Sequence, residues 1–166
     1  MHRINYTIRQ ADRADVDEIA AAHVDSIRSL GARYYAPDVV DAWCANVAGD
    51  LYANAMARGE IFFIAVGDID GDPAVLGFSS HKVLNGEHRT AVYVRGQAAR
   101  LGVGSALFDR AKAAAITAGA TIIRVDASLA AVDFYKANGF EEISTGEFRL
   151  RSGRTMPFVL MKKPLA

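Results

Sequence analysis

Hydrophobic and polar residues in the first third of the chain follow patterns that predict strands at both ends and helices between them. Residues 4–9 alternate between apolar and polar, and residues 61–66 form an unbroken apolar run, so both segments are expected to be strands. A helix is predicted over 13–30, where apolar residues recur at helical spacing behind Asp12, a favourable N-cap. Two shorter helical segments are predicted over 38–48 and 51–57.

The rest of the chain predicts a hairpin followed by mixed elements. A polar turn is expected over 67–73, and strands over 74–84 and 88–94 flank Asn85-Gly86, a strong signal for a two-residue hairpin turn. The later elements are predicted as helix, strand, helix, strand and strand, over 103–118, 121–126, 129–138, 141–150 and 155–162. We therefore expect an α/β (α+β) fold, with a mixed, mostly antiparallel central sheet of about seven strands flanked by helices.

Length and composition favour a single domain over residues 1–166. The 19 basic and 19 acidic residues balance, which argues against a protein that binds nucleic acid or a membrane surface through bulk charge. No apolar run approaches the roughly 18 residues that a membrane helix needs. The first residues lack a hydrophobic secretory segment, which favours a cytoplasmic location. Cys44 is the only cysteine, so an internal disulfide and a multi-cysteine metal site are excluded, and no metal is expected.

The run from Ala91 to Leu107 carries the first candidate chemistry. It begins with the β-branched and aromatic residues 92–94 and ends in a predicted helix, with Gly102 and Gly104 just before or at the helix start. Glycines there let the backbone turn tightly and let a ligand approach closely. The first turn of a helix has unpaired N–H groups and the positive end of the helix dipole. The run therefore predicts a site for a phosphate or pyrophosphate.

The same run has three other interpretations besides a site for a phosphate or pyrophosphate. A structural glycine loop before a helix is common. A P-loop is excluded because no lysine follows Gly104. A dinucleotide fingerprint would need a small residue where Leu107 stands, and glycines directly after the strand, whereas seven residues separate Val94 from Gly102. Asp126 stands about where a ribose-binding carboxylate is expected, so the dinucleotide interpretation stays open.

A second run, from Ala127 to Phe140, predicts a strand end, a short helix and a turn at Gly139. In purely structural terms, Phe134 belongs to the core and Tyr135 is a packed aromatic residue whose hydroxyl finds a partner.

Together, the two runs resemble the acyl-CoA-binding motifs of the GNAT superfamily of N-acetyltransferases. Residues 99–104, Ala-Arg-Leu-Gly-Val-Gly, occupy the place of the family's Gln/Arg-x-x-Gly-x-Gly/Ala, with the arginine one position late at Arg100. Ser128 stands where the family's second motif more often has Asn. The second motif is matched by Ala131, Phe134, Tyr135, Gly139 and Phe140. The resemblance covers about residues 61–163.

The resemblance implies transfer of an acetyl group from acetyl-CoA to a primary amine of a small molecule or to an exposed peptide amine. It implies Tyr135 as the general acid for the CoA sulfur, while Glu87, His88, His81 or a water near Thr90 are candidates for the base. The implied acetyl-CoA contacts are Val92, Tyr93, Val94, Arg100, Leu101, Gly102, Val103, Gly104, Ser105, Ser128, Ala131 and Phe134. The implied acceptor contacts are Arg28, Tyr34, Tyr35 and Trp43.

Two alternatives from other functional classes accompany this prediction. The chain could be a catalytically inactive CoA-binding module that acts as a sensor or scaffold, or it could be a dinucleotide-binding enzyme. No nucleic-acid or membrane partner is expected. The final strands could pair between two subunits to give a homodimer.

Overall fold

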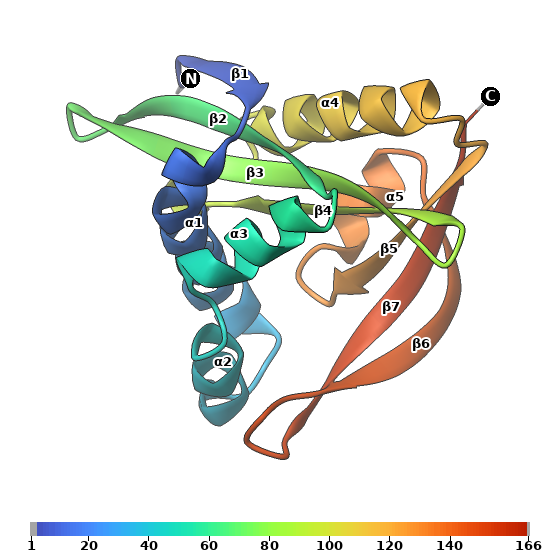
Figure 1. Cartoon of the computed structure of the whole chain (residues 1–166). Helices are drawn as coiled ribbons and strands as arrows, with labels where there is room; N and C mark the ends of the chain where they lie inside the picture. Colours follow the sequence, from blue (N-terminus) through green and yellow to red (C-terminus); the bar gives the residue numbers. More distant parts are fainter. Residues whose placement is uncertain (1–2, 166) are drawn as a thin grey trace.

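A twisted seven-stranded sheet runs through the molecule, with helices on both of its faces (Figure 1). The computed structural model describes residues 3–165; residues 1, 2 and 166 of the predicted domain lie outside the described residues. The strands are β1 (Tyr6–Gln10), β2 (Ile61–Ile69), β3 (Asp72–Leu84), β4 (Glu87–Val94), β5 (Ile122–Ser128), β6 (Glu141–Arg149) and β7 (Thr155–Pro164). Their order is β1-β2-β3-β4-β5-β7-β6, and only β4 and β5 run parallel. This confirms the predicted mixed, mostly antiparallel sheet.

The helices divide between the two faces of the sheet. They are α1 (Val16–Ser29), α2 (Pro37–Cys44), α3 (Gly49–Ala57), α4 (Val103–Thr117) and α5 (Val132–Ala137), with short 3-10 turns η1 (Arg13–Asp15), η2 (Gly31–Arg33) and η3 (Gly96–Ala98). Helix α4 buries Leu107 and Phe108 against one face, and α1 buries Ile19 and Ala22 against the other. Burial of these apolar stripes is what holds each helix to the sheet. No helix within residues 3–165 has both the length and the apolar character to span a membrane.

Hairpin turns follow the glycine signals of the sequence. Asn85 and Gly86 have φ angles of +52° and +78°, as the predicted two-residue turn requires. The turn predicted over 67–73 is wrong in extent, because β2 runs to Ile69 and β3 begins at Asp72. Only Asp70 and Gly71, with φ angles of +50° and +87°, form the turn. Gly67 lies inside the strand, where a Cβ atom would stand 2.7 Å from the Asn5 carbonyl oxygen.

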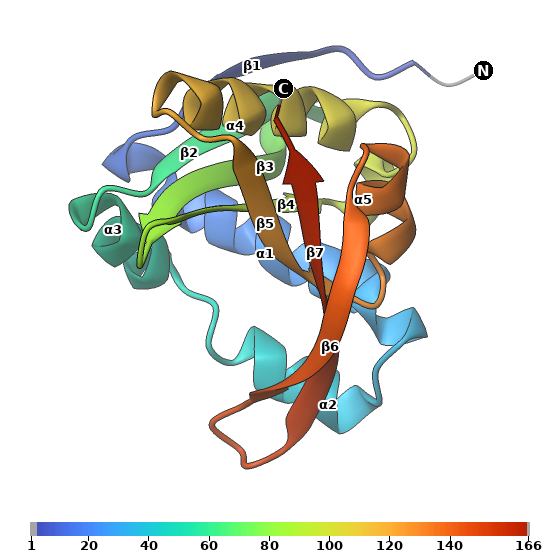
Figure 2. The same cartoon turned by 90° about the vertical axis from the view of Figure 1, so that its right-hand side faces the viewer.

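The final hairpin reaches beyond the sheet toward α2, as Figure 2 shows. Leu150 and Met156 near its tip join Val39 and Val40 of α2 in a separate apolar cluster. An ion pair of 2.8 Å between Arg154 and Asp38 lies beside that cluster. The hairpin therefore holds α2 and the loop before it in place.

Strands β4 and β5 separate soon after they meet. They pair only at His88 with Ile123 and at Arg89 with Arg124. Beyond Arg89, the backbone of β4 faces an opening rather than β5, and this opening positions the candidate site.

Candidate active site

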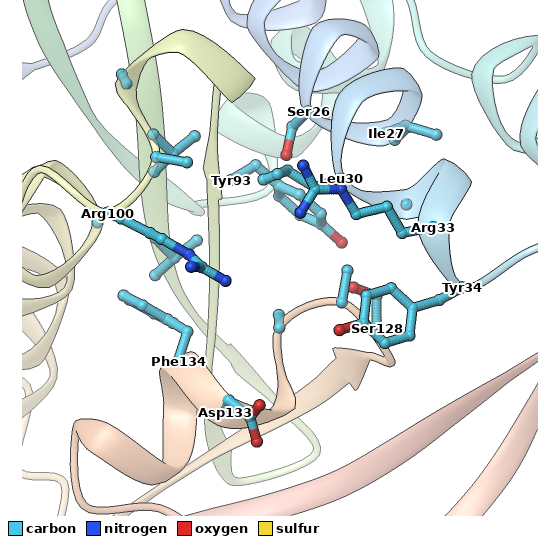
Figure 3. A pocket seen from close by; sticks show the side chains of 18 of the residues that line it. Ser26, Ile27, Leu30, Arg33, Tyr34, Tyr93, Arg100, Ser128, Asp133 and Phe134 are labelled. Atoms are coloured by element: carbon cyan, nitrogen blue, oxygen red, sulfur yellow. The ribbon is translucent and has the colours of Figure 1, made fainter.

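A cleft of about 400 Å³ lies at the opening between β4 and β5. Its walls come from α1, η2 and α2 on one side, and from the 95–102 loop, α4 and α5 on the other (Figure 3). All the predicted acetyl-CoA contacts line it except Leu101 and Val103, and Val103 is fully buried beneath it. A volume of this size is typical of a small-ligand site.

The N-terminus of α4 forms one end of the cleft. Arg100 and Gly102 lie in the left-handed region, with φ angles of +62° and +85°, and bend the chain into the helix. The first helical bond runs from the Ala106 N–H to the Gly102 carbonyl at 3.1 Å, so the N–H groups of residues 103–105 have no partner within the helix. Figure 3 shows the Arg100 side chain extending into the cleft. The dipole of α4, the unpaired N–H groups of residues 103–105 and the Arg100 guanidinium together favour the binding of an anion at this end of the cleft.

Gly104 serves a different purpose from Gly102. A Cβ atom on Gly104 would lie 2.8 Å from Cε1 of Phe134, whereas a Cβ atom on Gly102 would meet nothing within 4 Å. Gly104 therefore lets α4 and α5 approach closely and brings Phe134 to the cleft wall. The sequence predicted that both glycines let a ligand approach the backbone closely. Only Gly102 leaves open space for this, because Phe134 occupies the space beside Gly104.

The backbone of β4 supplies N–H groups to the opening. The Arg95 N–H donates to the Leu76 carbonyl on the β3 side at 2.8 Å, and the Val92 N–H donates to the opposite side, to Oη of Tyr135, at 3.0 Å. Because N–H directions alternate along a strand, the Val94 N–H points to the same side as that of Val92. Val94 lines the cleft and lies beyond the last β4–β5 pair, so its N–H can donate to a carbonyl oxygen bound there.

Tyr135 is a buried polar residue that contacts this backbone. Its side chain is 2% exposed, and burial raises the pKa of its phenol well above the ordinary value. The hydroxyl accepts a hydrogen bond from Val92 and keeps its own proton available for another acceptor. Tyr135 does not itself line the cleft, although Val92 and Phe134 on either side of it do. The phenol is therefore a protonated donor set just behind the cleft wall.

Aromatic side chains build the opposite wall. Trp43 and Tyr93 line the cleft, with ring centroids 6.3 Å apart, and burial raises the pKa of Tyr93 to about 12. Behind them lies His23, whose ring centroid is 4.0 Å from that of Tyr93 and whose Nδ1 is 2.5 Å from Oη of Tyr52. Burial lowers the pKa of His23 to about 3, so the imidazole is neutral. The aromatic part of this wall is therefore uncharged, and Ser26 of α1 and Arg33 of η2 supply its polar groups.

The structure brings only two of the four predicted acceptor contacts to the cleft. Tyr34 and Trp43 line it. Arg28 points away and forms an ion pair of 3.0 Å with Asp41 on the outer surface. Tyr35 is 7% exposed and serves as a strut: its hydroxyl donates to the Pro157 carbonyl at 2.6 Å and accepts from the Leu129 N–H at 2.9 Å.

Two of the predicted base candidates, Glu87 and His88, also lie outside the cleft. Glu87 and His88 begin β4, and the cleft opens at its other end, on the order of 16 Å from Glu87 to Val92 for an extended strand. Glu87 contacts Arg89 and Arg124 there, at 3.4 Å and 3.7 Å. Nδ1 of His88 lies 2.9 Å from Nε2 of His81, in a stacked pair of imidazoles. The assignment of Glu87 and His88 to the site must therefore be corrected.

Three polar residues that line the cleft were missed by the sequence analysis. Ser26 extends from α1, Arg33 from η2 and Asp133 from the first turn of α5 (Figure 3). Asp133 lies directly before Phe134, and Arg33 directly before Tyr34, so adjacency to a predicted site residue was the available signal. Asp133 is the one carboxylate among the lining residues. Within residues 3–165, no three His, Cys, Asp or Glu side chains gather as a metal site.

Comparison with known proteins identifies a family model that matches the chain and structures that share its fold. Residues 32–165 match a family model described as "Acetyltransferase (GNAT) domain". A GCN5-related N-acetyltransferase structure from Rhodopseudomonas palustris, whose name also includes "Aminotransferase, Class-II", aligns with a TM-score of 0.81 at 27% identity over 99% of both chains. PaiA N-acetyltransferase from Thermoplasma acidophilum, in complex with coenzyme A, aligns with a TM-score of 0.75 at 17% identity over 98% of this chain and 100% of that one.

A further structure, phosphinothricin acetyltransferase from Sinorhizobium meliloti in complex with acetyl-CoA, aligns with a TM-score of 0.67 at 20% identity, over 97% of this chain and 89% of that one. No protein among the curated ones matches the chain.

Proposed function

Since the chain belongs to the GNAT acetyltransferase family, we propose that it transfers an acetyl group from acetyl-CoA to a primary amine held in the β4–β5 cleft. The observation that carries the proposal is the open end of β4. There the Val94 N–H faces the cleft, and a protonated, buried Tyr135 is fixed by a 3.0 Å hydrogen bond from Val92. An oxyanion donor on β4 and a proton donor on α5 that is hydrogen-bonded to the same strand are what acyl transfer from a thioester needs.

The residues present fit acetyl-CoA. The N–H groups of 103–105 and the Arg100 guanidinium would hold the pyrophosphate, with the open space at Gly102 allowing close approach. Ser128, Ala131 and Phe134 would lie along the pantetheine chain. Acetyl-CoA supplies an acyl group that is already activated as a thioester, so the protein has mainly to position and polarise it.

In the proposed reaction, the amine nitrogen forms a bond to the acyl carbon and the carbon–sulfur bond breaks. The Val94 N–H stabilises negative charge on the carbonyl oxygen. The electron pair of the broken bond stays on sulfur, which takes the Tyr135 proton. The amine gives up one proton, and Asp133, the carboxylate in the cleft, can accept it directly or through water. The phenol then regains a proton from solvent.

Two alternatives make different predictions. A CoA-binding module without activity would bind CoA but release no thiol with any amine. A dinucleotide-binding enzyme with this glycine fingerprint needs a doubly wound parallel sheet, and a sheet with one parallel pair does not provide it.

The test is thiol release from acetyl-CoA over a panel of primary amines and short peptides, together with calorimetric titration of CoA. Micromolar CoA binding with turnover of at least one amine supports the proposal. CoA binding without turnover favours the inactive module, and stabilisation by NAD(P) with no response to CoA would overturn the assignment.

Homodimer formation and cytoplasmic location remain predictions. Strand β6 is a sheet edge that exposes Ile143 and Phe148, and light scattering of the purified protein tests whether two copies associate.

A further inference from the structure

The cleft contains a cation that the proposed reaction does not use. Arg33 extends from η2 into the cleft, toward Ser26 and Tyr93, from the side opposite to Arg100 (Figure 3). In the part of the chain that the structure describes, its guanidinium forms no ion pair, whereas Arg28 on the preceding helix is paired with Asp41. One guanidinium therefore serves each end of the cleft, and the one at the α1 end lacks a carboxylate partner.

A well-anchored loop carries this arginine. The N–H groups of Arg33 and Tyr34 donate to the Leu30 and Gly31 carbonyls at 3.3 Å and 2.9 Å. Tyr35 then ties the loop to two distant segments through its hydroxyl, at 2.6 Å and 2.9 Å. The backbone that projects Arg33 is therefore fixed before any ligand arrives, which lowers the entropic cost of binding.

The surroundings of Arg33 favour a carboxylate partner. Ile27, Leu30 and Trp43 give the same end of the cleft an apolar lining beside the exposed Arg33 side chain, and the buried Ser26 hydroxyl adds a neutral hydrogen-bonding group. A guanidinium offers paired, coplanar N–H donors that match the two oxygens of a carboxylate. Asp133 belongs to α5, on the other wall of the cleft.

We infer that the acceptor carries a carboxylate beside its amine, so that the substrates are free α-amino acids or close analogues, with Arg33 binding the carboxylate. This inference rests on the proposed acetyl transfer. It also separates two acceptor classes that the sequence left together, because the N-terminal residue of a peptide has an amide where a free amino acid has its carboxylate. Arg33 acts as a specificity-determining residue that touches the acceptor and leaves acetyl-CoA binding to Arg100 and α4.

The first experiment measures binding without turnover. The common L-amino acids and their carboxamides are titrated by calorimetry into enzyme saturated with CoA, and the same compounds are then assayed with acetyl-CoA. We expect at least one amino acid to bind about tenfold or more tightly than its carboxamide. Equal affinity across the pairs, or no binding of any amino acid, would overturn the inference.

The second experiment assigns the effect to Arg33. Arg33→Gln should raise the KM for the amino acid about tenfold or more and leave the KM for acetyl-CoA unchanged, and Arg33→Lys should restore part of the loss. Arg28→Gln is the matched control, since that arginine lies on the outer surface, and its kinetics should equal those of wild type. A rise in the acetyl-CoA KM in Arg33→Gln would place Arg33 in the donor site instead.

The outcomes keep the two proposals apart. Carboxylate binding that depends on Arg33 but is accompanied by no thiol release would uphold the inference and contradict the proposed reaction. Turnover of amines regardless of a carboxylate would uphold the reaction and contradict the inference.

Discussion

The two ends of the cleft are built in different ways. The end formed by β4, the 95–102 loop and α4, called the donor end below, relies on backbone N–H groups, on glycines and on a fixed helix start. The end formed by α1, η2 and α2, called the acceptor end, relies on single side chains, such as Arg33, Tyr34 and Trp43, projected from helices and a short turn. The first kind of site suits a ligand that is the same in every reaction, and the second can change from one acceptor to another by single substitutions.

The largest effect on activity is expected from a substitution of Tyr135. Tyr135→Phe removes the proton donor and should lower kcat at saturating acetyl-CoA by roughly ten- to a thousandfold, while the KM for acetyl-CoA changes little. Because the hydroxyl accepts from the buried Val92 N–H, the variant should also lose about 1–3 kcal/mol of stability.

Tyr35→Phe is the matched control for this variant. It removes another buried hydroxyl that accepts a backbone N–H, so a similar stability loss is expected. Because Tyr35 anchors the loop that carries Arg33, the KM for the acceptor should rise, but kcat at saturating acceptor should stay near that of wild type. Equal kcat values for the two variants would remove Tyr135 from the mechanism.

The packing of the donor end is tested at Gly104. Gly104→Ala places a methyl group 2.8 Å from Phe134 and should cost about 1–3 kcal/mol of stability and raise the KM for acetyl-CoA. Phe134→Leu in the same chain should recover part of that stability, because the smaller side chain makes room.

Gly102→Ala is the control. Its methyl group has open space, but residue 102 has a φ angle of +85°, so the loss of stability in this variant should not be relieved by Phe134→Leu. Chemical denaturation of the single and double variants measures these energies, and additive losses at Gly104 and Phe134 would contradict the contact.

The wall behind the acceptor end is tested by pH. His23 has its pKa lowered to about 3 by burial, so the folded state stays unprotonated where the unfolded state, with the ordinary value of 6.5, takes up a proton. Its contribution to stability is therefore present above pH 6.5 and is lost as the pH falls toward 3. Between pH 7 and pH 5 this loss is about 2 kcal/mol.

His23→Gln removes this proton uptake. The difference in free energy of unfolding between wild type and variant should therefore shrink by about that 2 kcal/mol between pH 7 and pH 5, as measured by urea denaturation. A difference that stays constant with pH would show that His23 is protonated in the folded protein.

The same division explains what the sequence could predict. Strands, helices and the glycine motifs depend on local periodicity and backbone conformation, so the sheet was predicted correctly, and most of the residues predicted to contact acetyl-CoA line the cleft. Which arginine faces the cleft depends on the direction of α1 relative to η2, and this is set by tertiary packing. Arg28 and Tyr35 were therefore predicted at the acceptor end in place of Arg33, only a few residues away.

The base candidates illustrate the same limit over a longer distance. Glu87 and His88 lie on the correct strand, but the sequence does not show where β4 and β5 separate. Asp133 lines the cleft from the first turn of α5, and its position directly before the predicted site residue Phe134 was the only local signal for this placement.

Amide hydrogen exchange with and without CoA tests the division of the cleft most directly. CoA should slow exchange at Val94 and at residues 103–105, whose backbone N–H groups face the opening and the helix start, and should leave the buried part of α1 from Ile19 to His23 unchanged. An added amino acid acceptor should extend protection to 31–35. Slower exchange at 31–35 with CoA alone, and none at 103–105, would contradict the account.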